Sequence, residues 1–234
     1  MTIGIMQPYL FPYLGYFQLM QAVDEFVLYD NIEFTKKGWI NRNRILVNGT
    51  DDFISFPLKK DSDYLHVRER RLADTWPQDS RKMLNRLTGS YKKAPYFNDV
   101  YPLLEAALGY DDLNLFQFIF NSLHLLKDYL QIDTRLNTSS TITIDHTLRA
   151  ENKVIAICKA LQANKYINPI GGVELYNKAI FMQEGIDLHF INMNPFVYKQ
   201  FENEFVPALS IIDVMMFNSV ETIQQHLQSG YTLI

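Results

Sequence analysis

Residues 2–29 read TIGIMQPYLFPYLGYFQLMQAVDEFVLY, and their pattern decides the fold class. Thr2–Met6 is a short apolar run, Tyr13–Ala22 places apolar residues at helical spacing, and Glu25–Tyr29 is a second apolar run. A strand, a helix and a strand in immediate succession predict a βαβ unit. The two strands of such a unit are parallel, and the crossover between them is right-handed.

The rest of the chain alternates in the same way around two inserted sections. Residues 39–72 predict a β-hairpin that turns at Asn48-Gly49 and a further strand at His66–Leu72, either as an insertion or as an edge element of the parallel sheet. Residues 77–130 predict a helical section. We therefore expect a single α/β domain over residues 1–234, with a mostly parallel, Rossmann-like sheet flanked by helices. The other expected elements are helices Pro77–Tyr91, Ala94–Leu108, Leu113–Leu130, Ala150–Leu161 and Val173–Gln183, and strands Thr134–Thr141, Lys165–Asn168 and Ile186–Phe190.

The composition excludes several classes of protein. The formal net charge is −4, which argues against a protein that binds nucleic acid polymers. One cysteine, Cys158, excludes an internal disulfide, and the five histidines show no metal-binding spacing, so we expect no metal site. We see no signal peptide and no apolar run long enough to span a membrane, so the expected location is the cytoplasm. No motif identifies a cofactor, and homo-oligomerisation stays open.

The loop after the first predicted strand is the first candidate for a binding site. Ligands of open parallel sheets sit at the carboxyl ends of the strands. Gln7 and Tyr13 offer amide and hydroxyl groups there, Pro8 restricts the loop, and Gly15 allows close approach to the backbone. Tyr16 adds a second hydroxyl. The alternative is a tight turn that is simply packed by its aromatic residues.

Two further loops are expected at the same edge. Residues 35–44 read TKKGWINRNR, where Lys37 and Arg42 suit a phosphate, Trp39 offers a stacking face, and Asn43 offers hydrogen bonds. A solvated basic loop is the alternative interpretation. The third loop lies between a strand and a helix, and its expected binding residues are Asn168, Gly171 and Gly172. Together the three loops predict one anion-binding cleft.

The chain contains the segments QPYLFPYLGYF, DEFVLYDNIEFTKKGWINRNRI, INPIGGVELY and FVPALSIIDVMMFN, in this order. Together they resemble the WbqC-like protein family over essentially the whole chain. The resemblance implies a setting in bacterial surface-polysaccharide (O-antigen) biosynthesis. It also singles out Ser210 and Asp213, where Asp213 would orient a substrate amine or hydroxyl, although Ser210 equally fits a helix N-cap.

The tetrad Tyr13-Leu14-Gly15-Tyr16 is also similar, more distantly, to the His-x-Gly-His signature of the nucleotidylyltransferase and pantothenate-synthetase superfamily. Tyrosine stands at both histidine positions. A tyrosine hydroxyl donates a hydrogen bond to phosphate, but it is neutral and cannot replace an imidazolium. Adenylate-forming chemistry would therefore need a cation from elsewhere.

These observations favour two hypotheses from different classes. The first is an enzyme, a transferase or ATP-dependent ligase that adds an acyl or aminoacyl group to a nucleotide-linked amino sugar, with Asp213 and Tyr16 as the catalytic residues. The second is a non-catalytic protein that binds a nucleotide-sugar or glycan, or assembles with another enzyme of the pathway. Glycosyl transfer is a third reading, without a D-x-D motif to support it. In each case the partner is a small nucleotide or nucleotide-sugar.

Overall fold

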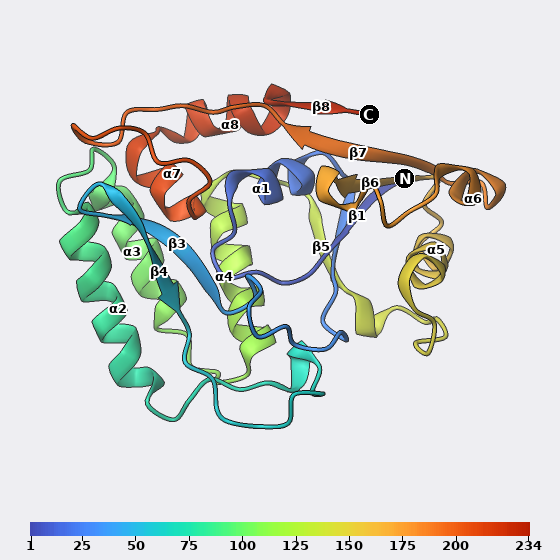
Figure 1. Ribbon diagram of the computed structural model, residues 1–234, viewed down its shortest axis with the longest axis horizontal. Coiled ribbons are helices and arrows are strands. Elements are labelled where there is room, and N and C mark those ends of the chain that lie inside the picture. Colours follow the sequence, from blue (N-terminus) through green and yellow to red (C-terminus); the bar gives the residue numbers. More distant parts are fainter.

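The computed structural model describes residues 1–234, which form a six-stranded sheet, a separate two-stranded hairpin and eight α-helices (Figure 1). The strand order of the large sheet is β5-β2-β1-β6-β7-β8, and every neighbouring pair is parallel except β7 with β8. The expected α/β class with a mostly parallel sheet is confirmed. The strands of this sheet are β1 Thr2–Met6, β2 Glu25–Leu28, β5 Arg135–Thr138, β6 Lys165–Pro169, β7 Asp187–Met193 and β8 Tyr231–Leu233.

Strand β1 lies in the middle of the sheet, and the chain builds outward from it in both directions. After β1 it adds β2 and then β5 on one side, and it later adds β6 and β7 on the other. The strand order therefore reverses between β1 and β6. Loops diverge at such a switch point and leave a crevice at the carboxyl ends of the two strands.

Side chains alternate between the two faces of the sheet and build two separate cores. On one face, Ile3 and Ile5 of β1 join a cluster of 14 buried residues with α5 (Ala150–Ala160). On the other face, Phe26 and Leu28 of β2 join a cluster of 44 buried residues. The helices of this larger cluster are α1 Leu14–Gln21, α2 Trp76–Tyr91, α3 Phe97–Leu108, α4 Leu115–Tyr129, α7 Ile211–Phe217 and α8 Val220–Ser229.

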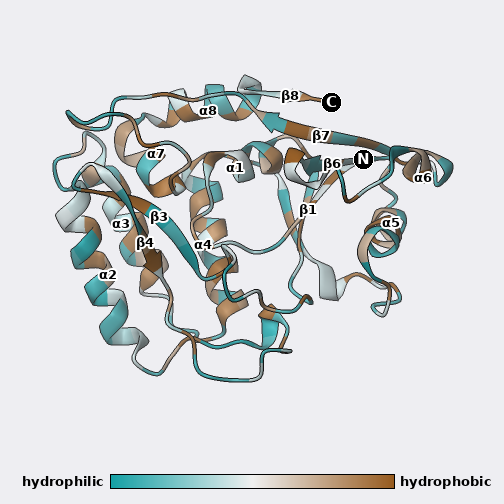
Figure 2. Cartoon of the chain, viewed as in Figure 1, coloured by the Kyte–Doolittle hydropathy of each residue, from teal (hydrophilic) through white to brown (hydrophobic).

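The expected helical section is present as α2 (Trp76–Tyr91), α3 and α4. Helix α2 buries Trp76, Met83, Leu87 and Tyr91, which lie on one face at helical spacing. Figure 2 shows hydrophilic and hydrophobic residues side by side along this helix, the pattern of a helix with one face on the core. The section thus packs as a helical layer beside the sheet (Figure 1).

The hairpin forms as expected, and of the two expected placements it is an insertion separate from the large sheet, not an edge element of it. Strands β3 (Arg42–Val47) and β4 (Thr50–Ser55) pair only with each other. Asn48 and Gly49 both have positive φ, at 51° and 82°, as a two-residue hairpin turn requires. Arg86 of α2 donates a hydrogen bond to a β4 carbonyl. The hairpin is therefore held by helices rather than by the sheet.

Two other expectations are corrected by the structure. His66–Leu72 is not a strand; its central residues Val67–Glu69 form a short 3-10 helix with isolated bridges on either side. Helix α6 begins at Lys178 rather than at Val173, because the side chain of Asn177 caps it by accepting from the Ala179 N–H. None of the helices combines the length and apolar character that a membrane crossing demands.

Candidate functional site

A cavity of about 650 Å³ opens at the carboxyl ends of β1, β6 and β7, where the strand order reverses. The loops after β1, β2 and β6 supply most of its walls. No Asp, Glu, Lys, Arg or His side chain lines it. Its polar side chains are four amides and five tyrosines, namely Gln7, Gln18, Asn168, Asn192, Tyr9, Tyr13, Tyr29, Tyr166 and Tyr176.

The structure brings together residues that the sequence assigned to three different loops. Trp39 reaches the cavity from the basic loop, and it is 40% exposed. The other predicted residues come from the segments after β1 and β6. The predicted site residues that line the cavity are Gln7, Tyr13, Gly15, Trp39, Asn168, Gly171 and Gly172.

The loop between β1 and α1, residues 7–13, is called the proline loop below. Two of the predicted residues fix its conformation by hydrogen bonds from the side away from the cavity. The amide of Asn43 donates to the carbonyls of Leu10 and Phe11, at 2.9 and 2.8 Å, and the hydroxyl of Ser210 donates to the carbonyl of Phe11 at 2.7 Å. Phe11 has φ of 39°, a conformation that is costly for a residue other than glycine. Asn43, Ser210 and the buried Pro8 do not line the cavity. Their contacts fix the shape of its wall.

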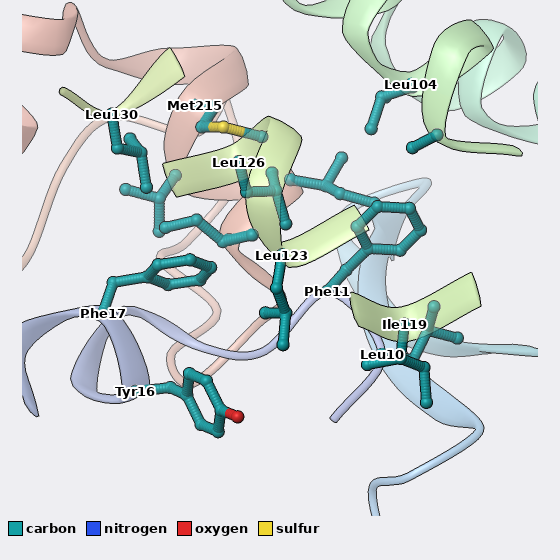
Figure 3. Close-up of a cluster of buried hydrophobic side chains, with 14 of the residues drawn as sticks. Leu10, Phe11, Tyr16, Phe17, Leu104, Ile119, Leu123, Leu126, Leu130 and Met215 are labelled. Atoms are coloured by element: carbon teal, nitrogen blue, oxygen red, sulfur yellow. The ribbon is translucent and has the colours of Figure 1, made fainter. Parts of the chain in front are cut away.

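Gly15 is explained by the ring of Tyr13. A Cβ atom on Gly15 would lie 2.4 Å from Cε2 of Tyr13, so only glycine lets this ring lie flat against the start of α1. Tyr16 is 1% exposed and its hydroxyl donates to the Gln7 carbonyl at 3.0 Å. Figure 3 shows it in the core beside Phe17. Tyr16 therefore does not reach the cavity, and its predicted catalytic role has no support in this geometry.

Asn168 and Gly172 form a close pair at the end of β6. Asn168 is 6% exposed, and its Oδ1 accepts a hydrogen bond from the hydroxyl of Tyr166 at 2.9 Å. A Cβ on Gly172 would lie 1.9 Å from Nδ2 of Asn168, whereas a Cβ on Gly171 would meet nothing within 4 Å. Gly172 thus makes room for the Asn168 amide, and Gly171 keeps an open backbone at the cavity wall.

A smaller hollow of about 210 Å³ adjoins the cavity and supplies a positive charge. It shares Tyr9, Tyr13 and Trp39 with the cavity and adds Arg44. The guanidinium of Arg44 lies 5.9 Å from the centre of the Trp39 ring and donates to the carboxylate of Asp51 at 3.0 Å. Its buried Nε atom has no hydrogen-bond partner in the protein. Arg44 is therefore the one charged residue that lines the adjoining hollow.

The other predicted cations of the basic loop have different surroundings. The guanidinium of Arg42 donates to the Gly38 carbonyl at 3.0 Å and stacks over the rings of Phe53 and Trp39. Lys37 is exposed and forms no ion pair. Neither lines the cavity or the adjoining hollow. Arg42 instead orders the loop that carries Trp39.

Asp213 is a buried structural hub. It is fully buried on α7 and accepts from the hydroxyls of Tyr91 and Tyr198, at 2.9 and 2.7 Å, and from the amide of Gln200 at 2.6 Å. Burial raises the pKa of its carboxyl group, and the hydrogen bonds from Tyr198, Gln200 and Tyr91 oppose that shift. It does not line the cavity, so the structure gives it no access to a ligand there.

The tyrosines of the cavity are neutral hydrogen-bonding groups. Burial raises the pKa of Tyr29 to about 12, and it also raises the pKa values of Tyr9, Tyr13 and Tyr176. A tyrosine hydroxyl both donates and accepts, as do the hydroxyls of a sugar. The structure contains no group of three or more His, Cys, Asp or Glu side chains placed to hold a metal ion. The arrangement suits a neutral, hydroxylated ligand group.

Sequence reasoning missed several residues of these walls. Tyr29 directly follows β2 and Tyr9 lies within the proline loop, so the rule about strand ends applied to both. Arg44 lay in the basic stretch but was not chosen from it. Tyr176 and Asn192 carried no local signal, because their place in the wall depends on how the segments after β6 and β7 pack.

Comparisons with known proteins give a family and one relative. A family model described as "WbqC-like protein family" matches residues 7–225. A protein of Mycobacterium tuberculosis, named "Uncharacterized protein Rv1507c", is 28% identical over 222 residues, covering 92% of this chain and 93% of that protein. No solved structure matches the chain.

Proposed function

The chain belongs to the WbqC-like protein family, and from this premise we propose that it modifies a nucleotide-linked amino sugar during the synthesis of bacterial surface polysaccharide. The modification is the transfer of an acyl or aminoacyl group to the sugar amine. The setting comes from the family resemblance. The residues of the site support the proposed substrate class.

One observation carries this proposal: a cavity with a neutral lining adjoins a hollow with a guanidinium, and aromatic rings form the boundary. The amides and hydroxyls of the cavity suit a sugar ring, which needs many neutral hydrogen bonds. Trp39, Tyr9 and Tyr13 offer stacking faces for a sugar or a base. Arg44 suits the phosphates that join them. The sugar, the base and the phosphates of one nucleotide-sugar thus each have a matching surface.

The transfer depends more on the positioning of the sugar amine against the acyl donor than on a reactive side chain of the protein. The sugar amine attacks the acyl carbonyl, an amide bond forms, and the donor's leaving group departs while the amine loses a proton. The amides of Gln7 and Asn168 lie in the cavity wall, where they would hold the amine and its neighbouring hydroxyls. Asp213 and Tyr16 have no direct part in this scheme, because both are buried and hydrogen-bonded inside the protein.

Binding is the first test. Thermal-shift and calorimetric titrations should use nucleoside-diphosphate amino sugars, the corresponding nucleoside diphosphates, ATP and the free amino sugars. We expect the complete nucleotide-sugar to bind more tightly than either half, because it engages both hollows. Absence of binding across the panel would refute the proposal.

Matched variants test whether the nucleotide-sugar binds at the two hollows. Trp39→Ala and Arg44→Gln should each weaken binding of the nucleotide-sugar by about tenfold or more, which corresponds to about 1.4 kcal/mol. Tyr64→Ala is the control for the first, since Tyr64 is an 80% exposed aromatic residue outside both hollows. Arg86→Gln is the control for the second. Like Arg44, Arg86 pairs with an aspartate of β4, but it lines neither hollow.

A second function is favoured by the absence of charged side chains from the cavity wall. Without an acid or base among the lining residues, the protein could bind the nucleotide-sugar and present it to another enzyme. Mass spectrometry separates the two functions. Saturable binding without any acylated product, tested with acyl and aminoacyl donors and with ATP, would select the binding function.

A further inference from the structure

Gln18, on α1, is a buried residue of the cavity wall whose side-chain amide is only half used. It lines the cavity and is 1% exposed. Its Nε2 donates to the main-chain carbonyls of His226 and Gly230, both at 2.9 Å. Its Oε1 is also buried, and it has no hydrogen-bond partner in the protein. A carbonyl oxygen that is buried without a donor destabilises the folded protein, so any donor that can reach it is favoured.

The two hydrogen bonds of Nε2 fix the orientation of the Gln18 amide. A glutamine amide can in general turn over and exchange its oxygen and nitrogen positions. Here the exchange would place Oε1 against the carbonyl oxygens of His226 and Gly230, and acceptors repel one another. The atom that is left without a partner is therefore the oxygen. It can accept a hydrogen bond but cannot donate one.

Two other glutamines show that this arrangement is specific to the cavity. Gln200 is equally buried, lies outside the cavity and is fully paired: its Oε1 accepts from the Val206 N–H at 2.7 Å, and its Nε2 donates to Asp213 at 2.6 Å. Gln21 has a buried Oε1 without a partner, but it is half-buried as a whole and does not line the cavity. Gln18 is the one residue of the cavity wall that carries a buried polar atom without a partner.

The position of Gln18 places its amide on the α1 side of the cavity. Gly15, three residues earlier on α1, also lines the cavity, so one face of this helix forms part of the wall. Asn192 and Met193 of β7 line it too. No lysine, arginine or histidine side chain lines the cavity. A ligand in the cavity is therefore the source from which a donor for Oε1 can come.

We infer that Gln18 determines the specificity of the cavity, and that its Oε1 accepts a hydrogen bond from an N–H or O–H group of the bound sugar. The inference rests on the proposed function, in which the cavity holds the sugar, and it adds the kind of group that the sugar must present to α1. A site built to bind a hydroxyl or amine rejects an analogue that lacks it, because the protein group is then left unpaired. An amine that donates an N–H to Oε1 also keeps its lone pair for the acyl carbonyl.

Calorimetric titration with matched ligands tests this. The probes are nucleoside-diphosphate hexosamines, the hexoses with a hydroxyl in place of the amine, and analogues with hydrogen in place of the amine or of each hydroxyl, together with the corresponding free sugars. At one ring position we expect wild type to bind the donor-bearing sugar about tenfold or more tightly than the analogue with hydrogen. At that position Gln18→Met should bind the two alike.

Two further variants separate specificity from stability. Gln21→Met makes the same change on the same helix away from the cavity, and it should keep the wild-type preference. Gln18→Glu keeps an acceptor oxygen but loses the donor to His226 and Gly230, so it should melt at lower temperature and still prefer the donor-bearing sugar. Full preference in Gln18→Met would overturn the inference. So would loss of the preference in Gln18→Glu, because Gln18 would then act only through its contacts with these two carbonyls.

A measurement on wild type covers the case in which Gln18→Met does not fold. In protein made with isotope-labelled glutamine, the side-chain carbonyl resonance of Gln18 is identified by its absence from Gln18→Glu. It should shift when the donor-bearing sugar binds and shift less with the hydrogen analogue. Equal shifts would overturn the inference.

These titrations distinguish failure of this inference from failure of the proposed function. If the nucleotide-sugars bind and Gln18→Met keeps the full preference, the inference falls and the proposed function stands. If no nucleotide-sugar binds but a free sugar binds with a preference that depends on Gln18, the inference stands and the proposed function falls. A wild-type protein that binds none of the probes overturns both.

Discussion

Replacing Gly172 by alanine tests how the wall of the cavity is built. The added Cβ would lie 1.9 Å from Nδ2 of Asn168, far inside van der Waals contact, so the Asn168 side chain has to move. That movement breaks the hydrogen bond that Asn168 accepts from the buried Tyr166 hydroxyl at 2.9 Å. Gly171→Ala is the matched control, because a Cβ there meets nothing within 4 Å.

The size of the effect follows from two terms. Overpacking a well-packed site costs about 1–3 kcal/mol, and a lost hydrogen bond costs about 1 kcal/mol. Because an asparagine amide can rotate, we place the total for Gly172→Ala near the lower end, at about 2 kcal/mol. For a chain of this size that lowers the melting temperature by about 4–8 °C. Gly171→Ala should be neutral or stabilise slightly, since alanine restricts the unfolded chain more than glycine does.

The assay pairs urea unfolding with ligand titration on both variants. Gly172→Ala should unfold at lower urea than Gly171→Ala, and it should bind the nucleotide-sugar more weakly than wild type does, because the displaced amide lies in the cavity wall. Equal urea midpoints for the two variants, with wild-type affinity in Gly172→Ala, would refute the argument that Gly172 makes room for Asn168.

Three further results are expected. Asp213→Asn should make the free energy of unfolding depend less on pH in the acid range. Because the pKa of Asp213 is raised, the folded protein keeps a proton that the unfolded chain releases above 3.8, and in wild type this carboxyl group lowers stability as the pH rises from there through its native pKa. Urea midpoints between pH 4 and 8 that vary as in wild type would contradict this. Asn43→Ala should cost about 1–3 kcal/mol and weaken ligand binding, since it removes the side-chain donor of the Leu10 carbonyl and leaves the Phe11 carbonyl with the Ser210 hydroxyl alone. Calorimetry measures both effects, and unchanged binding would mean that the loop keeps its shape without Asn43. Cys158 is fully buried and its pKa is raised to about 12, so a thiol reagent at pH 8 should label it in urea but not in the native protein; rapid native labelling would show that α5 opens.

The parallel sheet could be predicted because its signals are local. The alternation in residues 2–29 requires a crossover, and the turn at Asn48-Gly49 requires a hairpin, whatever the rest of the chain does. The location of the hairpin could not be predicted in the same way. It depends on contacts such as the one from Arg86 to β4, which join distant parts of the sequence.

For the site, too, features with a local signal could be predicted from the sequence, and features that depend on distant contacts could not. Gln7 and Asn168 were found because they follow strands of a parallel sheet, and the cavity lies at those strand ends. The place of Asp213 could not be read from its motif, because a short polar residue in a helix looks the same in sequence whether it faces a ligand or a core. Its burial depends on Tyr91 and Gln200, which reach it from other elements.

Strand β1 has one partner that follows soon along the chain, β2, and one that comes late, β6 (Figure 1). During translation β1 and β2 emerge together, but most of the chain must leave the ribosome before β6 can pair with β1. Until then one edge of the nascent sheet exposes its unpaired backbone groups, which invites association with other chains. The crevice between β1 and β6 is consequently among the last features to assemble, and a chain stalled before β6 would be unable to bind its ligand.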